Sequence, residues 1–142
     1  MLTENEIVDA VCKRLSEAGY RIDSRAATHQ RGVDIVASRR RTKLFVEAKG
    51  DTTSRQSSRA GYPFDRKQCG THVSVALFTA ARLVQEGLEA GERRQVAIAL
   101  PDNERHRGLV REIRWALVRL RVAVIWVDEA KIVRCPGRLI LR

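Results

Sequence analysis

Long apolar runs, paired cysteines and a secretion signal are all missing from this sequence of 142 residues. No apolar run approaches the roughly 20 residues that a membrane-spanning helix needs, so we expect no membrane partner. The first six residues (MLTENE) are acidic and polar, whereas a secretory signal is basic and then apolar, and we expect a cytoplasmic location. Cys12, Cys69 and Cys135 are odd in number and far apart, which argues against a disulfide framework or a zinc-binding spacing. We predict that all three are packing residues.

Lysine is also scarce, although the chain is strongly basic. The formal net charge is +10 and the pI is near 10.5, yet only five of the 27 basic residues are lysine. A compact chain with this excess of positive charge often binds a polyanion, because neutralising phosphates releases condensed counterions. A GC-rich genome, which favours arginine, would produce the same composition. The charge therefore suggests a nucleic-acid partner but does not locate a site.

The remaining composition, 44% hydrophobic and 31% charged, is typical of a globular chain, and 142 residues suit one domain. Thr3 and Glu6 form a capping-box pattern at the start of a helix that Gly19 ends. Hydrophobic periodicity predicts the further elements: strands at 20–25, 33–37 and 43–49, a helix at 64–85, a strand at 95–100, a helix at 107–121, a strand at 122–127, and a hairpin or edge strand within 131–142. Between them we expect a basic hairpin turn at 38–42, an exposed mobile loop at 50–63 and a turn at 87–94. The predicted fold is a single α/β domain, residues 1–142, with a mixed central sheet flanked by helices.

The sharpest chemical feature lies on the two strands 33–37 and 43–49. Side chains on a strand alternate between faces, so Glu47 and Lys49 share one face while their apolar neighbours form the core face. A hairpin would bring Asp34 beside Glu47, and two carboxylates that close repel unless a cation neutralises them. Magnesium suits such a pair, because it takes one or two carboxylates and leaves its other positions to water and phosphate. The alternative is that these are solvated or ion-paired charges at strand ends, since Glu-x-Lys alone is common by chance.

The joint pattern is more specific than either of its parts. The runs 32–37 (GVDIVA) and 44–50 (LFVEAKG) resemble the PD-(D/E)XK nuclease superfamily, which includes restriction endonucleases, Mrr-like enzymes and Holliday junction resolvases. The resemblance implies a restriction-endonuclease-like core, α-β-β-β-α-β, over about residues 3–100, with an added α-β over 101–142. It also implies that Asp34 and Glu47 hold Mg²⁺ or Mn²⁺ and that Lys49 is the catalytic lysine. No proline precedes Asp34, where Val33 stands, but many members lack that proline and have glycine two residues before the aspartate, as Gly32 is here.

Two further site residues are suggested by the same resemblance. Members often add a glutamate from the first helix, which here would be Glu6 or Glu4 as a metal ligand. Some branches use a glutamine near the catalytic centre, which here would be Gln68. Each has a simpler alternative role, because Glu6 completes the capping box and Gln68 lies at the start of a helix.

Phosphate contacts are expected from basic residues around the two strands. The hairpin turn contains three candidates, which either grip phosphates or serve solubility: Arg39, Arg40 and Arg41. The segment after Lys49 must emerge beside the proposed site, and its basic residues are our preferred backbone contacts: Arg55, Arg59, Arg66 and Lys67.

The histidines and tryptophans receive plainer assignments. His29, His72 and His106 show no spacing to a nucleophile, so we expect them on loops or helix surfaces. Trp115 and Trp126 are expected to be core or interface aromatics rather than platforms for base stacking.

Three hypotheses follow, in order of preference. The first is a metal-dependent endonuclease that hydrolyses DNA, without a small-molecule cofactor and as a homodimer. The second is a nucleic-acid-binding module with a nuclease fold, which does not cut or cuts only with a partner. The third is an RNA substrate, which a related endonuclease fold handles without the Asp and Glu-x-Lys metal site, so the residues present favour DNA.

Overall fold

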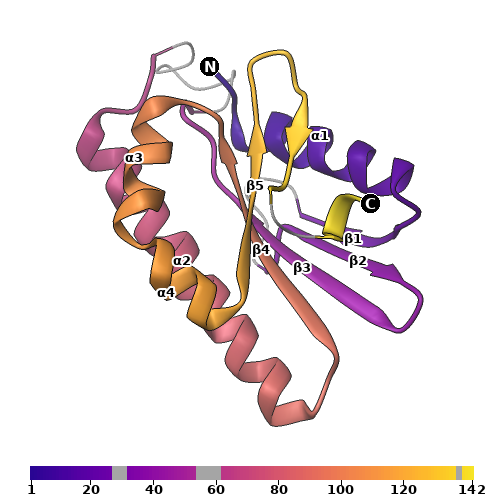
Figure 1. The fold of residues 1–142 in the computed structure, drawn as a ribbon. Helices are drawn as coiled ribbons and strands as arrows, with labels where there is room; N and C mark the ends of the chain where they lie inside the picture. Colours follow the sequence, from indigo (N-terminus) through magenta and orange to yellow (C-terminus); the bar gives the residue numbers. More distant parts are fainter. Residues whose placement is uncertain (27–31, 54–61, 137–138) are drawn as a thin grey trace.

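The computed structural model describes residues 1–26, 32–53, 62–136 and 139–142. Its elements follow one another along the chain as α1 (Glu4–Glu17), β1 (Arg21–Arg25), β2 (Ile35–Arg39), β3 (Thr42–Ala48), α2 (Arg66–Ala90), β4 (Arg94–Pro101), α3 (Glu104–Glu112), α4 (Arg114–Leu120), β5 (Val122–Val127), β6 (Val133–Arg134) and the short 3-10 helix η1 (Leu139–Leu141). The strands form one six-stranded sheet in the order β1-β2-β3-β4-β5-β6, so each strand pairs with its neighbours in sequence (Figure 1).

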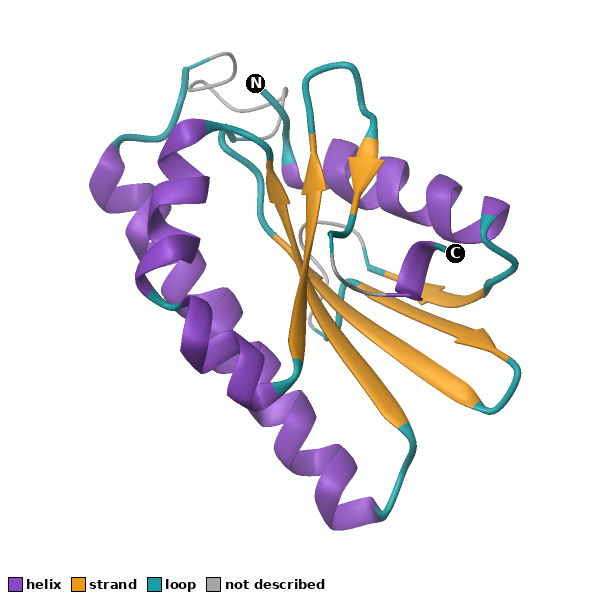
Figure 2. Cartoon of the chain, in the orientation of Figure 1, coloured by secondary structure: helices purple, strands orange, loops and turns teal. Residues whose placement is uncertain are grey.

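The sheet is mixed, as expected. The first three strands form an antiparallel meander, β3, β4 and β5 are parallel, and β6 returns antiparallel at the edge. Parallel neighbours need a crossover, and α2 and the pair α3–α4 supply the two crossovers. Figure 2 shows α1 on one face of the sheet and the crossover helices on the other. The carboxyl ends of β3, β4 and β5 therefore meet at one edge of the sheet, where the candidate site lies.

A hydrophobic cluster fills each face of the sheet. Beneath α1, the fully buried Ile7 and Leu15 pack on Ile35 and Val46. On the other face, one side of α2 packs on β4 and β5, with Ile98 almost fully buried. Burying a side chain of this size contributes about 1.5–3 kcal/mol relative to leaving it exposed. The two clusters hold the central strands rigidly between the helices.

The α/β order and the mixed sheet flanked by helices are confirmed, with corrections to α2 and β2. The helix α2 begins after the N-cap Asp65 and is capped at its end by Gly91, which has the left-handed conformation (φ 64°). It therefore extends beyond the predicted end at residue 85. The predicted turn at 87–94 is wrong for residues 87–90, which belong to α2. Gly87 lies inside the helix, where its lack of a side chain leaves room for Arg94. Strand β2 begins at Ile35, so Asp34 directly precedes the strand.

The predicted helix 107–121 is wrong as a single element. Asn103 caps α3 three residues earlier than expected by accepting a hydrogen bond from the backbone N–H of His106 (2.9 Å). The helix then breaks at Ile113, whose φ of −119° and ψ of 13° separate α3 from α4. The apolar periodicity continues across the break, which is why the sequence pattern does not reveal it.

The loop and the tail are each placed in part. Asp51 and Thr52 are buried, which corrects the prediction of an exposed loop at its start, and residues 54–61 lie outside the described residues. The tail forms the expected edge strand, β6, beside β5. Over the described residues, no helix has the length and apolar character required to cross a bilayer.

Candidate metal and catalytic site

Asp34 and Glu47 are brought together by the β2–β3 hairpin. The register pairs Ile35 with Val46, so Asp34, one residue earlier, comes opposite Glu47, one residue later. Both carboxyl groups are buried, each residue being only 7% exposed. The Oδ2 atom of Asp34 accepts a hydrogen bond from the backbone N–H of Ala48 at 2.8 Å, which fixes its orientation. The two acids predicted from strand alternation thus lie side by side.

Lys49 joins the pair from the end of β3. Its Nζ lies 3.1 Å from Oε1 of Glu47 and 4.0 Å from Oε2 of Glu4. Its backbone N–H donates to the carbonyl of Ala99 on β4 (3.0 Å), which holds this residue against the sheet. The lysine is mostly buried, so its ammonium is directed at these carboxylates.

The ionisation of these groups is strongly coupled. Burial, and then the charge of Asp34, raise the pKa of Glu47 to about 7. Burial also raises the pKa of Asp34, although hydrogen bonds from Ala48 and Glu47 oppose the rise. Burial alone would lower the pKa of Lys49, but the negative charges of Glu47, Glu4 and Asp34 outweigh it and raise that pKa. Near neutral pH the group can therefore share a proton or exchange it for a cation.

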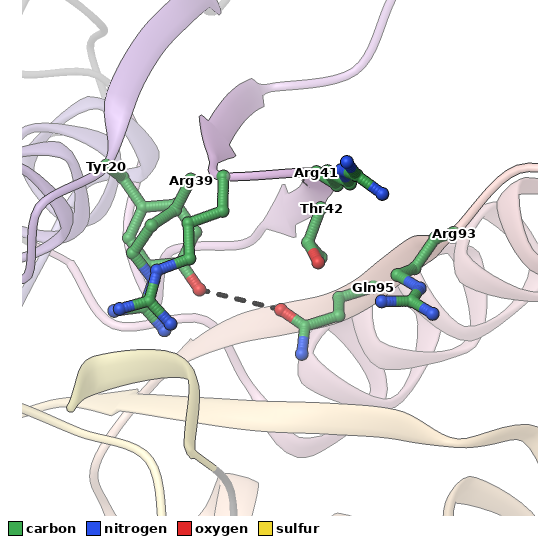
Figure 3. Close-up of a pocket in the computed structure, with 7 residues that line it drawn as sticks. Tyr20, Arg39, Arg41, Thr42, Arg93 and Gln95 are labelled. Carbon is green, nitrogen blue, oxygen red and sulfur yellow. Dashed lines mark hydrogen bonds between the residues drawn. The ribbon is translucent and has the colours of Figure 1, made fainter.

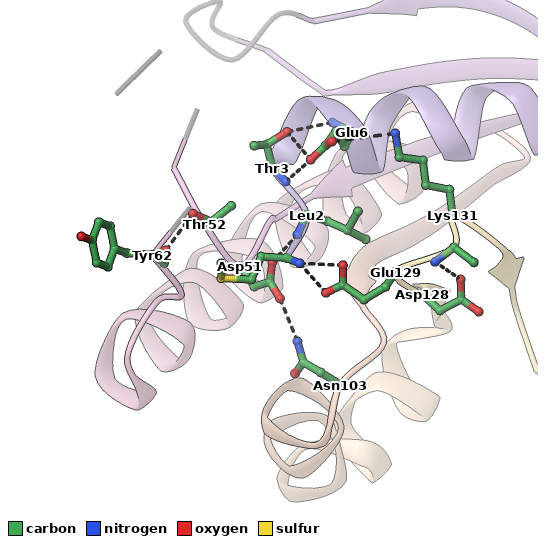
Figure 4. A network of polar contacts seen from close by, with 12 residues as sticks. Leu2, Thr3, Glu6, Asp51, Thr52, Tyr62, Asn103, Asp128, Glu129 and Lys131 are labelled. Atoms are coloured by element: carbon green, nitrogen blue, oxygen red, sulfur yellow. Dashed lines mark hydrogen bonds and ion pairs between the residues drawn. The ribbon is translucent and has the colours of Figure 1, made fainter. Parts of the chain in front are cut away.

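The start of the chain is held against this site through Gly50. A Cβ atom at this position would come within 2.5 Å of the backbone nitrogen of Glu4, so only glycine allows the approach. Asp51 reinforces it, because its Oδ1 accepts from the backbone N–H of Leu2 (2.6 Å) while its own N–H donates to the Leu2 carbonyl (2.9 Å). Figure 4 shows Asp51 between Leu2 and Asn103, whose Nδ2 donates to Oδ2 of Asp51 at 3.1 Å. These contacts place the first turn of α1 beside Lys49.

The N-terminal glutamate nearest the site is Glu4, whereas the contacts of Glu6 fix it elsewhere. Oε2 of Glu6 accepts from the backbone N–H of Thr3 at 2.9 Å, which completes the predicted capping box, and its Oε1 lies 3.8 Å from Nζ of Lys131 (Figure 4). Burial raises the pKa of Glu4. The charge of Lys49 lowers this pKa, and the charge of Asp34 raises it further. The charge of Glu4 in turn raises the pKa of Glu47.

Gln68 lies at the N-terminus of α2 and serves there as a helix cap. Its Oε1 accepts from the backbone N–H of Asp65 (2.9 Å), and its own N–H donates to Oδ1 of Asp65 (2.8 Å). One turn later, His72 stacks edge-on against Phe64, with ring centroids 4.6 Å apart. Burial, and then the charge of Lys49, lower the pKa of His72.

His106 corrects the expectation of a surface histidine, because it is fully buried. Its Nδ1 donates to Oδ1 of Asn103 (2.9 Å), and burial lowers the pKa of the ring. No sequence pattern indicated the role of Asp51 and Asn103 in this network. The proximity of Asp51 to the Glu-x-Lys motif was the only signal for it, since the partners lie about fifty residues apart.

The basic residues fall into separate groups. The residues at the hairpin tip, Arg39 to Arg41, lie at the opposite end of β3 from Glu47, about 17 Å away at 3.4 Å per residue. Arg66 and Lys67 are exposed at the start of α2, the end of that helix closer to the site. Arg55, Arg59 and His29 lie outside the described residues.

The donor set at Asp34 and Glu47 is one that suits a hard cation. Among the described residues no group of three or more His, Cys, Asp or Glu side chains is placed to hold a metal ion. Magnesium and manganese need no such cage, because one or two carboxylates suffice when water and phosphate complete the shell. Burial first and then the charge of Asp34 raise the pKa of Glu47, and a divalent cation bound there would stabilise its charged form. The residues present therefore fit this class of ion.

Comparisons with known proteins support the fold. No protein-family model matches the sequence, and no curated protein matches it significantly. An XisH family protein from Nostoc punctiforme overlaps with a TM-score of 0.59 at 18% identity, over 91% of this chain and 96% of that one. An FdxN element excision controlling factor protein from Anabaena variabilis overlaps with a TM-score of 0.55 at 20% identity, over 92% and 96%. SfsA from Pyrococcus furiosus, solved in complex with Ca²⁺, has a TM-score of 0.42 at 13% identity, over 94% and 59%. The first two likenesses establish a shared fold over almost the whole chain.

Proposed function

We propose that this chain is a metal-dependent endonuclease that hydrolyses DNA phosphodiester bonds. One observation carries the proposal: two buried carboxyl groups, Asp34 and Glu47, lie together with the ammonium of Lys49 at the edge of a nuclease-like sheet. Charged side chains buried this deeply cost stability unless they are paired or functional. Their position at the carboxyl edge of parallel strands is where α/β sheets place their ligands.

The chain's own residues have distinct parts in this proposal. Asp34 and Glu47 would hold Mg²⁺ or Mn²⁺, which when bound supplies an activated water and offsets charge on the phosphate. Lys49 would orient the attacking water or stabilise the developing negative charge, since its ammonium already lies 3.1 Å from Glu47. Arg66 and Lys67 would contact the DNA backbone at the start of α2, with Arg55 and Arg59 as further candidates.

Cleavage assays on plasmid, single-stranded and branched DNA test the proposal directly. We expect hydrolysis with Mg²⁺ or Mn²⁺, none with EDTA, and a loss of at least about 100-fold for Lys49→Ala. The matched control is Lys13→Ala, which removes an exposed lysine of α1 and should cleave normally. Cleavage that survives Asp34→Ala, Glu47→Ala and Lys49→Ala would falsify the assignment.

A second candidate function is a DNA-binding module with this fold that cuts only with a partner or not at all. Two observations favour it: Lys49 and Glu47 already neutralise each other as an ion pair, and one structural neighbour is described as a controlling factor for excision. This function predicts binding to DNA that weakens steeply with salt and no hydrolysis with either metal. Binding in EDTA followed by metal addition separates the two functions, because only the nuclease then degrades the bound DNA.

A further inference from the structure

We infer that the chain has a second anion site, a pocket that binds a phosphate ester at the end of the sheet away from Glu47. The pocket has a volume of about 420 Å³, which is within the range of about 300–1,000 Å³ usual for small-ligand pockets. Four of its lining residues are arginines that come together from the β2–β3 hairpin and from the residue before β4: Arg39, Arg40, Arg41 and Arg93. Of the described residues that line it, none is acidic.

The arginines converge because of strand register. Lys43 pairs with Arg94 across the parallel β3 and β4, so Arg93 comes beside Thr42 and the hairpin tip. Within the described part of the chain, Arg40, Arg41 and Arg93 form no ion pair with an acidic side chain. Like charges gathered in this way repel, and a bound anion would offset that repulsion.

The inner wall of the pocket is ordered by its own contacts. Arg39 stacks on the ring of Tyr20, with Cζ 4.3 Å from the ring centroid, and its Nη1 donates to the carbonyl of Ala18 at 2.8 Å. Figure 3 shows the Tyr20 hydroxyl donating to Oε1 of Gln95 (3.5 Å), which orients the Gln95 side chain beside Tyr20. A guanidinium held in place loses less freedom on binding than a mobile one.

Phosphate is the anion that matches this set of donors. Guanidinium groups present paired N–H donors that fit the oxygens of a phosphate in a bidentate geometry. The pocket is larger than a lone phosphate needs, so it has room for an attached sugar. Its distance from Glu47 and its position on the α1 face of the sheet separate it from the cleavage chemistry, and the inference stands apart from the proposed nuclease.

Binding of deoxyadenosine monophosphate to the whole chain, measured by calorimetry at low salt in EDTA, tests the site. We expect it to bind at least about tenfold more tightly than deoxyadenosine, because charge-assisted hydrogen bonds to the phosphate carry the affinity. The double variant Arg41→Ala/Arg93→Ala should lose at least about tenfold in affinity. Arg82→Ala/Arg119→Ala, which removes the same charge from exposed positions on α2 and α4, should bind normally. The site is refuted if deoxyadenosine binds equally well or if both double variants weaken binding equally.

Competition identifies the source of the phosphate ester. A 5′-phosphorylated DNA duplex that displaces the nucleotide better than the unphosphorylated duplex would assign the pocket to a DNA end. Failure of both duplexes to displace it, at matched phosphate concentration, would assign the pocket to a free nucleotide. Because EDTA removes divalent metal, this result is independent of whether the protein cleaves DNA.

Discussion

Among single residues, Glu47 links the stability of the protein to its metal chemistry. Its carboxyl group holds a proton more tightly in the folded chain, where its pKa is about 7, than in the unfolded chain, where it is near 4.5. Unfolding therefore releases this proton between those pH values. The contribution of Glu47 to stability is full below about pH 4.5 and is lost as the pH rises through 7.

Unfolding in urea at pH 5 and pH 8, in EDTA, measures this linkage. From pH 5 to pH 8 the unfolding free energy of the wild type should fall by about 1–3 kcal/mol through Glu47. Glu47→Gln should not show this fall. Glu17→Gln, at an exposed position on α1, is the matched control and should behave as wild type. An identical pH dependence in wild type and Glu47→Gln would contradict the prediction.

The two N-terminal glutamates are expected to separate by function. Glu4→Ala removes a negative charge 4.0 Å from the ammonium of Lys49 and should slow cleavage about tenfold, equivalent to roughly 1.4 kcal/mol on the barrier. Glu6→Ala removes the capping-box acceptor of Thr3 and should lower the unfolding free energy by about 1 kcal/mol with little effect on rate. Measuring the cleavage rate and the thermal unfolding midpoint of both variants tests this prediction. An equal loss of cleavage rate in the two variants would contradict it.

Contacts between residues close in sequence were predictable, and contacts between residues far apart in sequence were not. Strand alternation was enough to place Asp34, Glu47 and Lys49 together, because a hairpin is a local structure. The bond from Asn103 to Asp51 and the burial of His106 depend on how α3 docks on the end of β3. No local periodicity encodes that docking.

Among the elements, the contact between α1 and the end of β3 depends on a missing side chain. Gly50→Ala would place a methyl group 2.5 Å from the nitrogen of Glu4, and we expect a loss of about 1–3 kcal/mol or more, as for other overpacked positions. Gly70→Ala is the matched control, since no heavy atom lies within 4 Å of the added group and the position is helical. The control should gain about 0.5–1 kcal/mol. Denaturant titration of both variants measures these changes. Equal stability of the two variants would contradict the role of Gly50 in the contact between α1 and β3.

The order of helices and strands was predictable because the hydrophobic residues of most segments recur with a helical or a strand period. The failures lie where tertiary contacts override it: at Ile113, where one amphipathic pattern covers two helices, and at Gly87, where a residue typical of turns lies inside α2. The segment around Val73 is helical as predicted, because Asp65 caps it and Val73 is buried along the core-facing side. The capping box of Thr3 and Glu6 located the start of α1, whereas the caps at Gly91 of α2 and Asn103 of α3 were not recognised.

For the whole molecule, we expect a homodimer, because cutting both DNA strands needs two sites. Trp126 is buried beneath Arg107 and is not available for such contact. Trp115 (69% exposed) and Val118 (51%) on α4 are the more suitable contact residues.

Sedimentation at tens of micromolar tests this association. Wild type should sediment as a dimer, and Trp115→Ser/Val118→Ser as a monomer, because the exchange removes most of the apolar surface of α4. Leu88→Ser, near the far end of α2 and 75% exposed, should remain dimeric. A monomeric wild type would remove the expectation altogether.

The first residues of the chain are anchored by residues made a hundred positions later. The amino group of Met1 pairs with Glu129, Glu6 approaches Lys131, and Asn103 holds the carboxylate that binds Leu2. A chain emerging from the ribosome would therefore contain Asp34, Glu47 and Lys49 well before all the contacts that anchor its first residues could form. Full assembly of these contacts would wait for translation to pass the β5–β6 turn, so a prematurely terminated polypeptide would lack part of the anchorage of its first residues.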